Sequence, residues 1–133
     1  MNQQPLRVML VAEDSSKLQT LCAGLQRAGY LVKLVHTCRE ALVAARSFLP
    51  DLFVSSFTLP DLDSVAAAVE IKQWDAACEV LLLGPVAKNQ QAMRTVNVGG
   101  FSLLIVSQHS PVTDLLRDIN FVLDQRAYYR KAS

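Results

Sequence analysis

The sequence predicts an α/β fold of the (βα)5 kind, a doubly wound parallel sheet covered by helices on both faces. Two observations carry this prediction. Short continuous apolar runs of strand length recur along the chain, and segments with helical spacing lie between them. Because each crossover between strands is then a helix, the strands must lie parallel and the helices must cover both sides of the sheet.

The expected strands are five in number. Leu31–His36 includes the charged Lys33, which is typical of an edge strand that meets water on one side. The other four are apolar throughout, as strands buried on both faces are. They are Val8–Val11, Leu52–Val54, Val80–Leu83 and Leu103–Val106.

Five helices are expected between and after these strands. The first has apolar residues at helical spacing from Leu18 to Leu25, a cap among residues 14–16, and an end at Gly29. The last begins at Ser110-Pro111, since proline suits a first helical turn, and extends toward Tyr129. The other three are expected after Thr37 up to Leu49, from about Asp63 to Trp74, and from about Lys88 to Val96.

The composition is that of one globular domain. The chain has 133 residues, of which 51% are hydrophobic and 19% charged, and its net charge of +1 predicts neither a nucleic-acid nor a membrane partner. The three cysteines are odd in number and widely spaced, which predicts reduced thiols rather than disulfides or a zinc site. The polar N-terminus has no signal-peptide or membrane-span pattern, so we expect a cytoplasmic protein.

The loops after the strands are where a functional crevice is expected, because doubly wound sheets bind at the carboxyl ends of their strands. In order, the segments Arg7–Asp14, Ala28–Val32 and Pro50–Ser64 resemble the receiver domain of two-component response regulators. The third segment is similar almost throughout, and the resemblance spans Arg7 to about Asp124. It implies a flavodoxin-like sheet with strand order 2-1-3-4-5.

The residues that carry phosphorylation in that family are replaced here. The phosphoacceptor aspartate stands four positions before the loop proline, and four before Pro60 is Ser56. The acidic pair falls on Ala12 and Glu13, with Asp14 as a possible stand-in. The family's hydroxyl, its lysine, the proline after the lysine, and its switch aromatic fall on Gly84, Val106, Ser107 and Leu103.

These replacements remove what phosphoryl transfer to a carboxylate needs, namely a nucleophile, a magnesium ion held by carboxylates, and cations that stabilise the transferred oxygens. We therefore expect a degenerate pseudo-receiver with no catalytic residues, no enzymatic activity and no cofactor. Only Glu13 and Asp14 remain as candidates for a Mg²⁺ site.

The function that follows is signalling through contact with another protein, with an effector domain of the same full-length chain, or with a second copy. Residues 1–124 form the receiver-like domain in this interpretation, and residues 125–133 are a helical extension or the start of a linker. The contact surface that the resemblance implies includes Met93, Leu103, Ile105, Leu116 and Asp118.

Two other functions stay open. Small residues at three strand ends, Ala12, Ser56 and Gly84, leave room for a small molecule or nucleotide, as in a sensor domain. Alternatively, Asp14, Asp61 or Asp63 accepts a phosphoryl group at a non-standard position.

Overall fold

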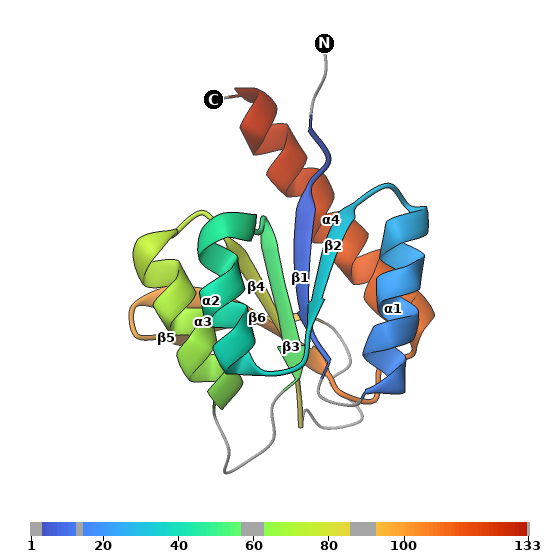
Figure 1. Cartoon of the computed structure of the whole chain (residues 1–133), viewed down its shortest axis with the longest axis horizontal. Helices are drawn as coiled ribbons and strands as arrows, with labels where there is room; N and C mark the ends of the chain where they lie inside the picture. The colour runs from blue at the N-terminus through green and yellow to red at the C-terminus, as the bar shows by residue number, and fades with distance from the viewer. Residues whose placement is uncertain (1–3, 13–14, 57–62, 86–92, 133) are drawn as a thin grey trace.

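The computed structural model describes residues 4–12, 15–56, 63–85 and 93–132, and it forms a six-stranded sheet between two helix layers (Figure 1). The strands are β1 Arg7–Val11, β2 Leu31–Val35, β3 Leu52–Ser56, β4 Glu79–Gly84, β5 Arg94–Val98 and β6 Phe101–Ser107. The helices are α1 Ser16–Arg27, α2 Cys38–Phe48, α3 Asp63–Trp74 and α4 Val112–Ala132.

The sheet has the order β2-β1-β3-β4-β6-β5. Its first five members are parallel neighbours, so the five strands predicted from sequence lie in the predicted order. β5 is an addition that pairs antiparallel with β6 and forms an edge. The prediction of a purely parallel, five-stranded sheet is therefore wrong in this one element.

The helix expected from Lys88 to Val96 is the second correction. Residues 86–92 lie outside the described part of the chain, and Arg94–Val96 belong to β5. β-Branched Thr95, Val96 and Val98 favour a strand over a helix. Gly99 and Gly100 have φ angles of 58° and 83°, which a two-residue hairpin turn requires at both central positions. The glycine pair thus closes a hairpin between β5 and β6, and the described residues contain four helices rather than five.

The core consists of two apolar clusters, one on each face of the sheet. Alternate residues of a strand point to opposite faces, so Val8 and Leu10 join the cluster under α1 and α4, while Met9 and Val11 join the cluster under α2 and α3. Figure 1 shows these two helix pairs on opposite sides of the sheet. Both faces are therefore covered, as the apolar strands require.

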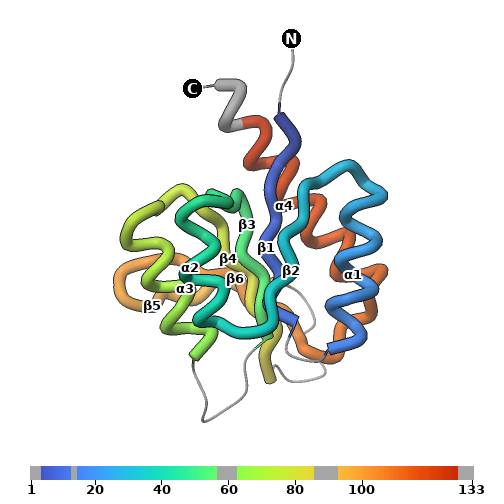
Figure 2. The backbone as a smooth tube through the Cα atoms, viewed as in Figure 1, coloured from blue at the N-terminus to red at the C-terminus, as the bar shows by residue number. Residues whose placement is uncertain are grey.

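Helix α4 contacts the rest of the domain through packing and a side-chain hydrogen bond. A Cβ added to Gly24 of α1 would lie 3.1 Å from Leu116, so the two helices approach closely there. The Tyr30 hydroxyl donates to Asn120 Oδ1 at 2.8 Å. The helix continues beyond the amino ends of the strands (Figure 2) and passes residue 124 without a break, so the division of the chain at that residue stays a prediction.

None of the described helices is long and apolar enough to cross a membrane. The three cysteines are free thiols. Burial raises the pKa of the Cys78 thiol to about 12, with Asp75 adding to the rise. Cys78 therefore stays protonated at neutral pH.

Candidate functional site

The carboxyl edge of the sheet brings four of the sequence-predicted pocket positions together. The register pairs Val11 with Ser55, and Ser56 with Leu83, which in turn pairs with Val106. Ala12 follows directly after β1, and Gly84 ends β4. The ends of four neighbouring strands thus meet at one edge, while Glu13 and Asp14 lie outside the described residues.

The side chains at this edge carry almost no polar chemistry. Ala12 and Val106 are fully buried and belong to the cluster under α1 and α4. Gly84 is also buried, whereas Ser56 is exposed. Val106 stands at the position where the resemblance predicts the family's lysine. In the described residues, Ser56 has a hydroxyl, and β6 provides no cation beside it.

Three serines form a hydrogen-bonded cluster at the end of β3. The hydroxyls of Ser55 and Ser64 lie 2.8 Å apart, and the Ser64 hydroxyl donates to the carbonyl oxygen of Ser56 at 2.6 Å. Ser55 and Ser64 are buried, and Cys38 Sγ lies 3.5 Å from Ser64 Oγ. The cluster fixes the first turn of α3 against the end of β3. Sequence reasoning missed Ser64, whose only signal is its position directly after the expected helix start.

Lys17 hydrogen-bonds the loop between β6 and α4 to the first turn of α1. Its Nζ donates to the carbonyl oxygens of Gln108 at 2.8 Å and of Ser110 at 2.9 Å. The Gln108 N–H donates to the carbonyl oxygen of Gly84 at 2.9 Å, which binds the same loop to β4. No motif in the sequence pointed to Lys17, because its partners are backbone atoms more than ninety residues away.

A metal site is not assembled by the side chains that the structure describes. Within residues 4–12, 15–56, 63–85 and 93–132, no three acidic, histidine or cysteine side chains gather in a way that could hold an ion. Asp63 is exposed in the first turn of α3. The candidates Glu13, Asp14 and Asp61 lie outside the described residues.

The contact surface expected from sequence does not form one face. Leu103 is fully buried in the cluster under α2 and α3, so this position cannot contact a partner. Leu116 packs on α1 at Gly24 and is partly buried there. Met93 belongs to the face under α4, and Ile105 to the opposite face. The strand alternation of β6 and the tight α1–α4 contact explain these corrections.

Asp118, the remaining member of that set, is partly buried on α4 and lies within 3.7 Å of the Arg117 guanidinium. Burial raises the pKa of the Asp118 carboxyl above its usual value, against the opposing effect of Arg117. One turn further, Phe121 is 55% exposed. It lines a hollow of about 430 Å³ with Met93 and Thr95, under the β5 edge of the sheet.

Curated proteins with similar sequences are transcriptional regulators. The chain is 28% identical over 105 residues to the transcriptional regulatory protein ZraR of Escherichia coli K12, a match that covers 79% of this chain and 24% of ZraR. It is 29% identical over 85 residues to the alkaline phosphatase synthesis transcriptional regulatory protein PhoP of Bacillus subtilis, covering 64% of this chain and 35% of PhoP. The chain thus spans about a quarter to a third of these relatives. No protein-family model matches it.

Solved structures show the same fold. A signal receiver domain of an HD domain-containing protein from Pseudomonas fluorescens superposes with a TM-score of 0.76 at 21% identity, covering 98% of this chain and 96% of that one. A CheY-like response regulator receiver domain from Methanospirillum hungatei superposes with a TM-score of 0.73 at 18% identity, covering 94% and 98%. This chain therefore has the fold of response regulator receiver domains, and its sequence is similar to those of transcriptional regulatory proteins.

Proposed function

We propose that this receiver domain signals by contact with other proteins and without phosphorylation of an aspartate. The observation that carries the proposal is which side chains lie at the carboxyl edge of the sheet. Ser56 stands at the acceptor position with a bonded hydroxyl pair behind it, and the buried Val106 stands at the lysine position. Phosphoryl transfer to a hydroxyl needs a base that activates it and a cation that stabilises the transferred oxygens, and the described residues of β6 supply neither beside Ser56.

The hydrogen bonds of Ser64 at the start of α3 and of Lys17 to the β6–α4 loop support a domain with a single resting conformation. Ser64 binds the start of α3 to β3, and Lys17 binds the β6–α4 loop to α1. A ligand shifts a conformational equilibrium only by the difference in its affinity for the two states. Because the phosphoryl group is what receivers detect at this edge, its absence leaves the domain in one constitutive state.

The surface around Phe121 on α4 is our candidate for contact with a partner protein. Phe121 and Tyr128 are 55% and 69% exposed, and their seven-residue spacing places them on the same side of α4. The relatives are much longer proteins, so we propose that this domain belongs to a regulator of transcription and that residues 125–133 lead toward its effector domain.

An NMR titration with magnesium and beryllium fluoride, a phosphoryl analogue for receivers, tests this proposal. Amide spectra of the chain are recorded with and without both salts. We expect no shift of the amides of β6, of α4 or of Ser56, because no carboxylate at the acceptor position can ligate beryllium. Shifts that saturate and cluster at the ends of β3 and β6 would overturn the proposal.

The sensor function is tested separately by thermal-shift measurements with common nucleotides and metabolites. A hollow of about 1150 Å³ lies between α2 and α3, and neither Ala12, Ser56 nor Gly84 lines it. The sensor hypothesis therefore stays a prediction that rests on the small residues Ala12, Ser56 and Gly84 alone.

A further inference from the structure

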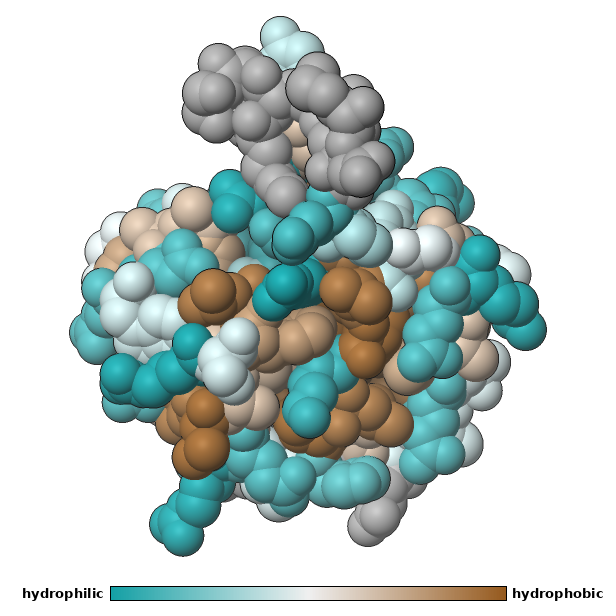
Figure 3. All heavy atoms as spheres, turned by 45° about the horizontal axis from the view of Figure 1, so that its top comes forward, coloured by the Kyte–Doolittle hydropathy of each residue, from teal (hydrophilic) through white to brown (hydrophobic). Residues whose placement is uncertain are grey.

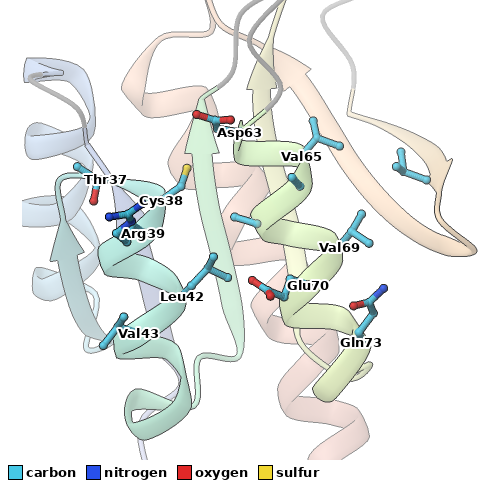
Figure 4. Close-up of a pocket in the computed structure, with 13 residues that line it drawn as sticks. Thr37, Cys38, Arg39, Leu42, Val43, Asp63, Val65, Val69, Glu70 and Gln73 are labelled. Carbon is cyan, nitrogen blue, oxygen red and sulfur yellow. The ribbon is translucent and has the colours of Figure 1, made fainter.

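Helices α2 and α3 leave an open groove on the face of the molecule opposite α4. The groove has a volume of about 1150 Å³ (Figure 4). It continues into a hollow of about 290 Å³ that shares Leu42, Val43 and Glu70 with it and reaches Arg46 and Trp74. The two hollows together follow most of the length of both helices.

The floor and one rim of this groove are apolar. Val43 is 73% exposed, the most exposed of the large hydrophobic side chains in the described chain, and Leu42 beside it is half-buried. Figure 4 shows Leu42 pointing from α2 toward α3. Figure 3 shows hydrophobic side chains exposed between hydrophilic ones on this side of the molecule. Covering these side chains would remove apolar area from water, which favours association.

The two walls of the groove carry opposite charges at matching intervals. Arg39 and Arg46 lie about two turns apart on α2, with Leu42 and Val43 between them on the same side of the helix. Asp63 and Glu70 lie about two turns apart on α3. Figure 4 shows Asp63 and Glu70 pointing toward α2. One wall is therefore positive and the other negative, each with the same spacing.

We propose that this groove is the docking site for a second copy of the chain, with a twofold axis parallel to α2 and α3. Both helices begin at the carboxyl edge of the sheet and run in the same direction. A twofold axis along that direction places α2 of one copy on α3 of the other at equal height. Arg39 then faces Asp63 of the second copy, and Arg46 faces Glu70 of the second copy.

The charge pattern also selects against the other symmetric arrangement. An axis perpendicular to the helices would lay α2 on α2 and α3 on α3, so that arginine faced arginine and carboxylate faced carboxylate. Like charges placed opposite one another cost several kilocalories per mole and suppress the wrong pairing. The groove is thus complementary to its own twofold copy in one orientation only, which is the property of an isologous interface.

This interface lies on the opposite side of the sheet from Phe121 and α4 (Figure 1). Docking of a second copy therefore leaves the proposed partner surface of α4 open. The proposal does not depend on the phosphorylation state, and its failure would leave the proposed function untouched.

A charge-swap experiment tests the pairing. Sedimentation velocity is measured at about 100 µM for the wild-type chain, for Arg46→Glu, for Glu70→Arg, and for an equal mixture of the two variants. We expect a wild-type dimer, at least about tenfold weaker self-association of each variant, and a restored dimer in the mixture. In the mixture, the Glu at position 46 faces the Arg at position 70, and the unchanged Glu70 faces the unchanged Arg46.

The mixture also controls for folding. Arg46 lies 5.6 Å from the Trp74 ring centroid, so the Arg46→Glu chain lacks this stacking both alone and in the mixture. Only the mixture is expected to regain the dimer, so loss of the stacking cannot explain the difference between the two samples. Arg27→Glu is the matched charge reversal, because Arg27 is exposed in the last turn of α1 on the opposite face of the sheet, and it is expected to dimerise like the wild type. A monomeric wild-type chain, a mixture as weak as its components, or loss of the dimer in Arg27→Glu would each overturn the proposal.

Discussion

The Ser64 hydroxyl of α3 donates to the carbonyl oxygen of Ser56 at 2.6 Å. The bond connects the last residue of β3 with the first turn of α3. It therefore positions the start of α3 against the end of β3, where Ser56 lies.

Substitution Ser64→Ala is expected to lower the free energy of unfolding by about 1–2 kcal/mol, since it breaks a buried hydrogen bond and removes a partner of the Ser55 hydroxyl. Urea unfolding followed by circular dichroism measures the change. Ser47→Ala is the control, because the Ser47 hydroxyl is exposed and only donates back within α2, and it should cost less than about 0.5 kcal/mol. Equal effects of the two variants would show that the serine cluster contributes nothing.

Lys17→Met keeps the length of the side chain but removes the ammonium that binds the β6–α4 loop. Its loss should cost about 1–2 kcal/mol, because Nζ makes two charge-assisted hydrogen bonds. Hydrogen exchange of the Gln108 and Leu115 amides should become faster, which reports on the loop and the start of α4. Lys33→Met on the exposed side of β2 is the control. Unchanged exchange at both amides would contradict the role given to Lys17.

Gly100→Ala distinguishes the observed hairpin from the helix that the sequence predicts before it. In the hairpin, φ at Gly100 is 83°, so alanine should destabilise the chain by about 1 kcal/mol. No heavy atom other than those of its own neighbours lies within 4 Å of an added Cβ, so a clash cannot explain the loss. If the segment were helical and ended near this residue in an ordinary helical conformation, the same change would stabilise it. Thermal unfolding gives the sign directly.

The Asp118→Asn variant tests the burial of the Asp118 carboxyl on α4 through the pH dependence of the free energy of unfolding. The pKa of the Asp118 carboxyl is raised above its ordinary value of 3.8, mainly by burial. The charged form is therefore disfavoured in the folded chain, and stability that Asp118 contributes below its unfolded pKa is lost as the pH rises through the folded pKa. The variant should gain stability relative to wild type between acidic and neutral pH. A difference that stays constant with pH would contradict the raised pKa.

The five parallel strands could be predicted from sequence, because each apolar run and each helical stripe is a local pattern, whereas their order was implied by the resemblance to receiver domains. β5 could not, since the residues of Arg94–Val98 fit a helix by spacing and a strand by β-branching, and the turn at Gly99 and Gly100 decided between them. Lys17 escaped prediction because its partners are backbone atoms more than ninety residues away, and Ser64 because its bonds to Ser55 and Ser56 depend on how the start of α3 packs against the end of β3. Leu103 is buried because it lies on the face of β6 that packs under α2 and α3. The resemblance to receiver domains did not specify this face.

The central claim, that the domain does not take up a phosphoryl group, is tested most directly by intact-mass spectrometry after incubation with acetyl phosphate and Mg²⁺. A receiver domain with a complete set of acceptor, acidic pair and lysine serves as the positive control in the same buffer. The account predicts an unmodified mass for this chain while the control is modified. The addition of one phosphoryl group to this chain would contradict it.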